Sequence, residues 1–154
     1  MKAHFAEVLA RESIRLAAVN DGAELAVWRA QLVGELMTPR SPYALALRKP
    51  GPVPTERAEF LRRWQGLIAR TLDRVVRSGD GAGSACPRSP SGPAAVDPER
   101  TAVLILAAVH GGCTLSRVAQ DPWPLDAALD MALAPLTSSG GPGDDNTGSI
   151  DAGQ

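Results

Sequence analysis

Apolar residues recur at helical spacing in five stretches of the chain. The stretches cover residues 2–19, 23–37, 54–79, 97–120 and 121–136. In the first, Phe5, Val8 and Leu16 repeat every three to four residues or a multiple of this, with Glu12 inside the same series. An Asn-Asp-Gly turn separates the first stretch from the second. The pattern predicts an all-α fold: a single helical bundle of about five main helices.

Helix-start signals and loop-like segments set the predicted boundaries. Asp97 is expected to cap the fourth helix, with Pro98 at its first position, and Thr55 is expected to cap the third. The proline-rich stretch 38–54 has room for one short helix, and 79–96 is a loop rich in Gly, Ser and Pro. Residues 137–154 have no apolar pattern, so we expect one domain over 2–136 and a disordered tail over 137–154.

The fourth helix is apolar on nearly every side. No charged residue occurs between Thr101 and Ser116. The stretch is too short and too interrupted to span a membrane, so a buried helix is the better interpretation. The chain has too few other helices to cover it fully, and a second copy would supply the missing cover. Gly111 and Gly112 would allow another helix to approach its backbone closely.

These observations predict a homodimer formed by the last two helices, which would build a four-helix bundle with those of the partner. The leucine stripe of the fifth helix suits antiparallel or crossed packing. The predicted interface residues are Val103, Gly111, Gly112, Leu115, Leu125, Leu129, Leu133 and Leu136.

Composition narrows the function classes. The chain has 154 residues and a formal net charge of −1, so it has no overall field to attract nucleic acid or an anionic membrane. Its two cysteines and two histidines show no metal-binding spacing, and we expect no metal and no cofactor. His4 and Glu7 interrupt the first ten residues, which do not resemble a secretory signal; the expected compartment is the cytoplasm, with both thiols free.

The candidate chemistry is that of a binding pocket, not of catalysis. No nucleophile, base and orienting group can be assembled, so we expect no catalytic residues and no enzyme. A pocket between the second, third and fourth helices would be apolar and would take flat or greasy molecules. The predicted ligand-binding residues are Trp28, Leu32, Tyr43, Trp64, Ile68, Leu106 and His110. Each aromatic is as well explained by core packing. For His110 we favour a structural role, either as a core histidine bonded to a neighbour or as a residue at the dimer seam.

Basic residues on the third predicted helix offer a second candidate. Arg63, Arg70, Arg74 and Arg77 share one side of this helix at helical spacing. Acidic residues share the helix and no aromatic residue is interleaved among the arginines, so a solvated surface is favoured over a phosphate-binding stripe.

Several runs of the sequence together resemble a known family of regulators. The runs 96–102 and 104–112, the Asp-Pro-Trp-Pro-Leu sequence at 121–125, and 127–136 resemble the C-terminal domain of tetracycline-repressor-type (TetR) transcriptional regulators. The similarity covers about 2–136, and the multidrug-responsive subgroup is the nearest in pattern. The motifs are helical packing patterns, which are less specific than a metal or nucleotide signature.

The resemblance implies an all-helical domain that dimerises through its last two helices and encloses a small-molecule pocket. The helix-turn-helix domain that precedes it in that family has no counterpart in this sequence, so we expect no DNA binding by this chain alone. The first hypothesis is a ligand-sensing and dimerisation module of a TetR-like regulator, with an apolar or aromatic effector. The alternative is an interaction protein that pairs with itself or with an intact regulator and binds no ligand.

Overall fold

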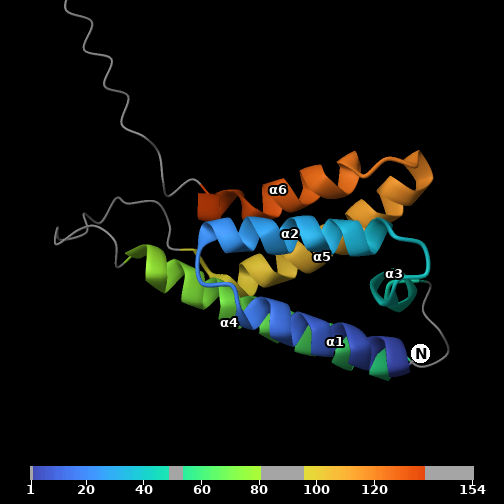
Figure 1. Ribbon diagram of the computed structural model, residues 1–154, viewed down its shortest axis with the longest axis horizontal. Coiled ribbons are helices and arrows are strands. Elements are labelled where there is room, and N and C mark those ends of the chain that lie inside the picture. Colours follow the sequence, from blue (N-terminus) through green and yellow to red (C-terminus); the bar gives the residue numbers. More distant parts are fainter. Residues whose placement is uncertain (1, 49–53, 81–95, 138–154) are drawn as a thin grey trace, which may run out of the picture.

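A computed structural model describes residues 2–48, 54–80 and 96–137, and this part of the chain is all-α (Figure 1). The helices in chain order are α1 (Lys2–Ala17), α2 (Gly22–Met37), α3 (Pro42–Ala46), α4 (Pro54–Asp80), α5 (Pro98–Ala119) and α6 (Trp123–Thr137). The prediction of an all-helical fold with five main helices is confirmed, and α3 is the short helix expected in the proline-rich connector.

Two packed helix pairs organise the bundle. α1 lies along α4, and α5 and α6 form an antiparallel hairpin that α2 covers from one side (Figure 1). α4 also packs against α5, which joins the two pairs, and α3 contacts α1 and α2 near one end. The core therefore lies between α1, α2, α4 and the inner sides of α5 and α6.

Local capping explains most of the helix boundaries. Asp97 accepts hydrogen bonds from the backbone N–H groups of Glu99 and Arg100 at 3.0 and 3.3 Å, so its predicted capping role is confirmed. Gln120, with φ of 55°, ends α5 in the left-handed region. The predicted cap at Thr55 is wrong, because α4 already begins at Pro54 and Thr55 lies inside its first turn.

Arg74 stabilises the junction between the two long helices α1 and α4. Its guanidinium donates to the carbonyl oxygens of Leu16 at 2.6 Å and Val19 at 2.9 Å, which lie in the last turn of α1 and just beyond its end. The prediction of a solvated arginine face is therefore wrong at this position. Arg63, Arg70 and Arg77 do lie on the surface.

Several predicted segments fall outside the described residues. The predicted tail is described only to Thr137, where α6 ends, and the predicted loop 79–96 is described only at its two ends. Cys86 lies in the undescribed part of this loop, whereas Cys113 is a buried free thiol on α5.

Candidate functional site

A buried carboxylate is the centre of the core. Glu12 on α1 is fully buried, and its two oxygens accept hydrogen bonds from three other helices. The Oε2 atom accepts from the indole nitrogens of Trp28 on α2 at 3.1 Å and Trp64 on α4 at 3.0 Å. The Oε1 atom accepts from the hydroxyl of Tyr43 on α3 at 2.7 Å. One side chain thus joins α1, α2, α3 and α4.

Burial and these donors act in opposite directions on the pKa of Glu12. Removal from water raises the pKa above its ordinary value, because the charged form loses hydration, and this effect dominates. The hydrogen bonds from Tyr43, Trp64 and Trp28, in that order, lower the pKa because they stabilise the anion. Burial and the nearby carboxylate raise the pKa of the Tyr43 phenol.

A chain of polar contacts links the carboxylate to the surface. Arg15 donates to the Tyr43 hydroxyl at 3.1 Å and pairs with Glu35 on α2 at 2.9 Å. Glu35 in turn lies 3.3 Å from the guanidinium of Arg11. Because the Tyr43 hydroxyl accepts from Arg15, its own proton is free to bond Glu12. The orientation of every donor in the cluster is therefore determined.

The aromatic residues predicted to bind a ligand are the residues that hold Glu12. Trp28, Tyr43 and Trp64 are at most 2% exposed. Their polar atoms bond the carboxylate, and the rings of Tyr43 and Trp64 meet edge to face. Leu32, Ile68 and Leu106 belong to the same buried cluster. These six side chains therefore pack against other residues of the same chain.

His110 is half-buried and bonded on both ring nitrogens. An amino group of Arg57 on α4 lies 3.1 Å from His110 Nε2, and the Leu106 carbonyl oxygen lies 3.3 Å from Nδ1. A guanidinium only donates, so Nε2 accepts and the neutral ring carries its proton on Nδ1. Burial and the Arg57 charge lower the pKa of His110. The position agrees with the expectation of a histidine bonded to its neighbours.

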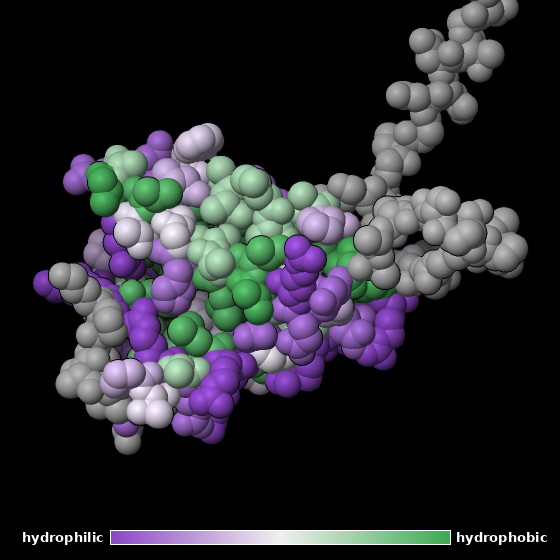
Figure 2. All heavy atoms as spheres, turned by 180° about the vertical axis from the view of Figure 1, so that it is seen from behind, coloured by the Kyte–Doolittle hydropathy of each residue, from purple (hydrophilic) through white to green (hydrophobic). Residues whose placement is uncertain are grey.

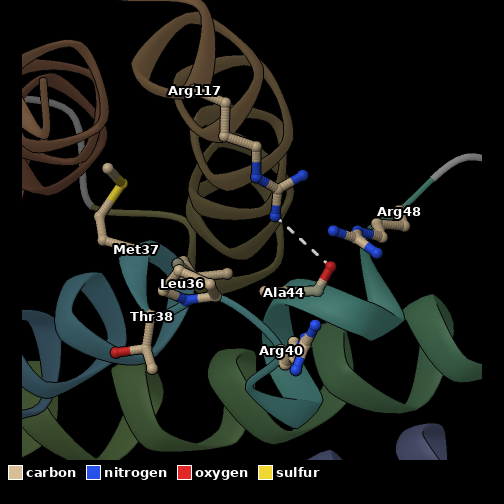
Figure 3. A pocket seen from close by; sticks show the side chains of 8 residues that line it. Leu36, Met37, Thr38, Arg40, Ala44, Arg48 and Arg117 are labelled. Atoms are coloured by element: carbon tan, nitrogen blue, oxygen red, sulfur yellow. Dashed lines mark hydrogen bonds between the residues drawn. The ribbon is translucent and has the colours of Figure 1, made fainter. Parts of the chain in front are cut away.

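Two surface hollows lie away from the predicted pocket. One, of about 220 Å³, lies beside α3 and is lined in part by Arg117 of α5 (Figure 3). We call it the arginine hollow; its lining residues are Leu36, Met37, Thr38, Pro39, Arg40, Ala44, Arg48 and Arg117. The other, of about 340 Å³, lies between α1 and α4 and is lined by Leu9, Ser13, Arg62, Arg63, Gly66, Leu67 and Arg70.

Half of the residues predicted at the dimer interface lie inside the chain's own α5–α6 hairpin. Gly112, Leu125, Leu129 and Leu133 are buried in the single chain. A Cβ atom on Gly112 would lie 2.7 Å from the Cα atom of Leu125, so this glycine does admit a neighbouring helix. That helix is α6 of the same chain.

The other four predicted interface residues lie at or near the surface of the chain. Val103, Gly111 and Leu115 are exposed, and Leu136 is half-buried. A Cβ atom on Gly111 would meet nothing within 4 Å. Gly112 therefore lies in the contact between α5 and α6, whereas Gly111 lies on the outer surface.

The outer side of α5 is an exposed stripe without a charged residue. Its members are spaced three and four residues apart, which places them along one side of the helix. We call this the α5 stripe: Leu104, Ala107, Gly111, Leu115 and Val118. Leu115 is 61% and Val118 82% exposed. Viewed from behind, the molecule shows apolar residues gathered across the middle of this face (Figure 2).

α5, with 22 residues, meets the length and composition limits of a membrane-spanning helix, so the expectation that this stretch is too short and too interrupted does not hold for the whole helix. A third of its most apolar window is buried in the protein. Core helices of water-soluble proteins meet the same limits. Among the described residues, no three His, Cys, Asp or Glu side chains are grouped closely enough to hold a metal ion.

Comparison of the chain with family models, with curated proteins and with solved structures found no match. The likeness to TetR-type regulators therefore rests on the sequence runs between residues 96 and 136, and the function that it implies is a proposal.

Sequence reasoning did not identify Glu12 as the centre of the cluster. The available signal was a carboxylate in the middle of an apolar helical series, flanked by Val8 and Leu16 on the same side. A charged residue in such a position needs buried partners, and two tryptophans and one tyrosine were the obvious donors. The arginine hollow could not be predicted from the sequence, because its three arginines belong to different parts of the fold.

Proposed function

We propose that this chain is a homodimerisation module that pairs through the α5 stripe, in the manner of the C-terminal domain of a TetR-like regulator. The observation that carries the proposal is the exposed apolar stripe on a helix whose other sides are already covered. Large exposed apolar surfaces on soluble proteins mark interaction sites.

A second copy of the chain is the partner that best fits this stripe. In a two-fold interface each patch meets itself, so any charge on the axis would face a like charge. The α5 stripe has none, since its five members are apolar and four of them lie in the uncharged run from Thr101 to Ser116. Gly111 lies in its middle with free space above its backbone, which permits two α5 helices to cross closely.

The buried aromatic cluster narrows the proposal to dimerisation without a core ligand. Trp28, Tyr43 and Trp64 direct their polar atoms to Glu12, which leaves none of these atoms to recognise a small molecule. A core ligand would have to break these hydrogen bonds. These bonds support pairing without a ligand among the aromatic residues of the core.

The test is the oligomeric state of matched variants. Sedimentation equilibrium at micromolar concentration should give a dimer for the parent chain, and Leu115→Glu and Leu104→Glu should give monomers that keep their helical circular dichroism. Ile14→Glu is the control, because Ile14 is 75% exposed on α1, outside the stripe. It should remain a dimer.

A parent chain that sediments as a monomer and melts cooperatively would disprove the proposal. Binding of an aromatic compound that changes the fluorescence of Trp28 or Trp64 would instead restore the ligand-sensing hypothesis. Single-tryptophan variants would assign such a signal.

A further inference from the structure

Three guanidinium groups converge on the arginine hollow from three separate parts of the fold. Arg40 follows α2, Arg48 follows α3, and Arg117 reaches in from α5 (Figure 3). Arg117 donates to the carbonyl oxygen of Ala44 at 3.4 Å. The tertiary structure, and not one helix surface, therefore gathers these charges.

These charges are not neutralised by the part of the chain that the structure describes. None of the three arginines forms an ion pair there, whereas Arg11, Arg15 and Arg29 all pair with carboxylates. No acidic residue lines the hollow. The three side chains are exposed, so their charges are open to a ligand from solvent. Like charges that line one hollow without counter-charges form a site that an anion would stabilise.

The backbone at Arg40 adds an independent observation. Its φ of 66° lies in the left-handed region, which favours glycine and is costly for a long side chain. The conformation places a guanidinium at the hollow where glycine would be easier to accommodate. Strained backbone of this kind gathers at ligand sites.

The shape and lining define the ligand class. Leu36, Met37 and Ala44 give the hollow an apolar wall beside the guanidinium groups. A volume of about 220 Å³ suits a small molecule. Guanidinium groups match the geometry of carboxylate and phosphate oxygens, with two parallel hydrogen bonds to each group.

The second hollow provides a contrast within the same molecule. Its arginines, Arg62, Arg63 and Arg70, all come from α4. Arg63 pairs with Glu59 at 2.6 Å, and Arg62 bonds the carbonyl oxygen of Ala58 at 3.3 Å. One of the three charges in this hollow, that of Arg63, is thus already paired with a carboxylate.

We propose that the arginine hollow binds the oxyanion group of a small molecule, either a carboxylate or a phosphate, with any short apolar part lying on the wall formed by Leu36 and Met37. The site is separate from the α5 stripe, so the proposal stands whether or not the chain dimerises.

Titration with two probes at constant ionic strength tests the proposal and separates the two oxyanions. Inorganic phosphate and hexanoate should be added while the arginine Nε–H signals are followed by NMR. We expect saturable shifts at Arg40, Arg48 and Arg117 with at least one probe. Tighter binding of hexanoate would identify a carboxylate with an apolar tail, and tighter binding of phosphate would identify a phosphate ligand.

Variants separate binding from folding. Arg117→Gln should weaken binding about tenfold or more, because a charge-assisted contact is lost. Arg70→Gln, in the second hollow, should leave affinity unchanged. Arg40→Gly should weaken binding while folding at least as stably as the parent, since glycine suits the local φ. Shifts that never saturate, equal losses in Arg70→Gln, or unchanged affinity in Arg40→Gly would overturn the proposal.

Discussion

The indole nitrogen of Trp64 donates a 3.0 Å hydrogen bond to the carboxylate of Glu12, although 52 positions separate the two residues. Trp28 donates to the same oxygen atom from another helix. An indole N–H can only donate, so both rings need an acceptor where they are buried. The aromatic side chains therefore depend on Glu12 as much as it depends on them.

Replacing Glu12 with alanine should destabilise the fold strongly. Glu12→Ala leaves two indole N–H groups and one phenol without an acceptor and opens a void, which should lower the free energy of unfolding by about 3–5 kcal/mol. Glu12→Gln is the matched control, since its amide oxygen can accept from both indoles and only the Tyr43 hydroxyl loses its acceptor. It should cost less than about 1.5 kcal/mol. Urea denaturation measures both, and equal losses would contradict the hydrogen-bond account.

The raised pKa of Glu12 predicts a specific dependence of stability on pH. The folded state holds this proton more tightly than the unfolded chain, so the contribution is full below the ordinary value of 4.5 and is lost as pH rises through the raised value. The free energy of unfolding of the parent minus that of Glu12→Gln should therefore decrease as pH rises from 4.5. A difference that stays flat or increases would refute the assignment.

His110 should give the opposite slope. Burial and Arg57 lower its pKa, so the folded state binds this proton less tightly than the unfolded chain does. Its contribution is present above the ordinary value of 6.5 and is lost as pH falls from there through the lowered value. His110→Gln keeps an acceptor for Arg57 but does not titrate. Thermal unfolding between pH 7.5 and 5 should show a smaller loss of stability for this variant than for the parent.

The two adjacent glycines of α5 should respond differently to alanine. Gly112→Ala would place a Cβ atom 2.7 Å from the Leu125 backbone and should cost about 1–3 kcal/mol. Gly111→Ala meets open space and should stabilise the helix by up to about 1 kcal/mol. Urea melts at two protein concentrations would separate folding from any dimer effect. Equal responses would mean that α6 packs elsewhere.

Charges placed on α6 should distinguish its buried and exposed sides. Leu129 is fully buried and Met131 is 79% exposed. Leu129→Arg should cost several kcal/mol, roughly 3–5, because a lone charge would be desolvated in the hairpin. Met131→Arg should change the free energy of unfolding by less than about 0.5 kcal/mol. Circular dichroism melts of the two variants, made under the same conditions, provide the comparison.

Local signals along the chain were sufficient to predict the helices. Asp97 caps α5 and a turn at 20–21 precedes α2, because capping and turn formation involve residues only a few positions apart. The buried stripe of α6 also followed from its leucine spacing, since Leu125, Leu129 and Leu133 are buried as a set. The partner that buries them did not follow, because an apolar stripe does not specify which helix covers it.

The sequence by itself determined which segments are helical and which of their sides are apolar, because both properties depend on neighbours within one or two turns. Only the tertiary structure decided that Trp28, Tyr43 and Trp64 meet on Glu12, because their hydrogen bonds join four helices brought together by packing. It also decided that Gly112 faces α6 while Gly111 faces outward, because successive residues of a helix differ in direction by about 100° and only packing sets the rotation of α5.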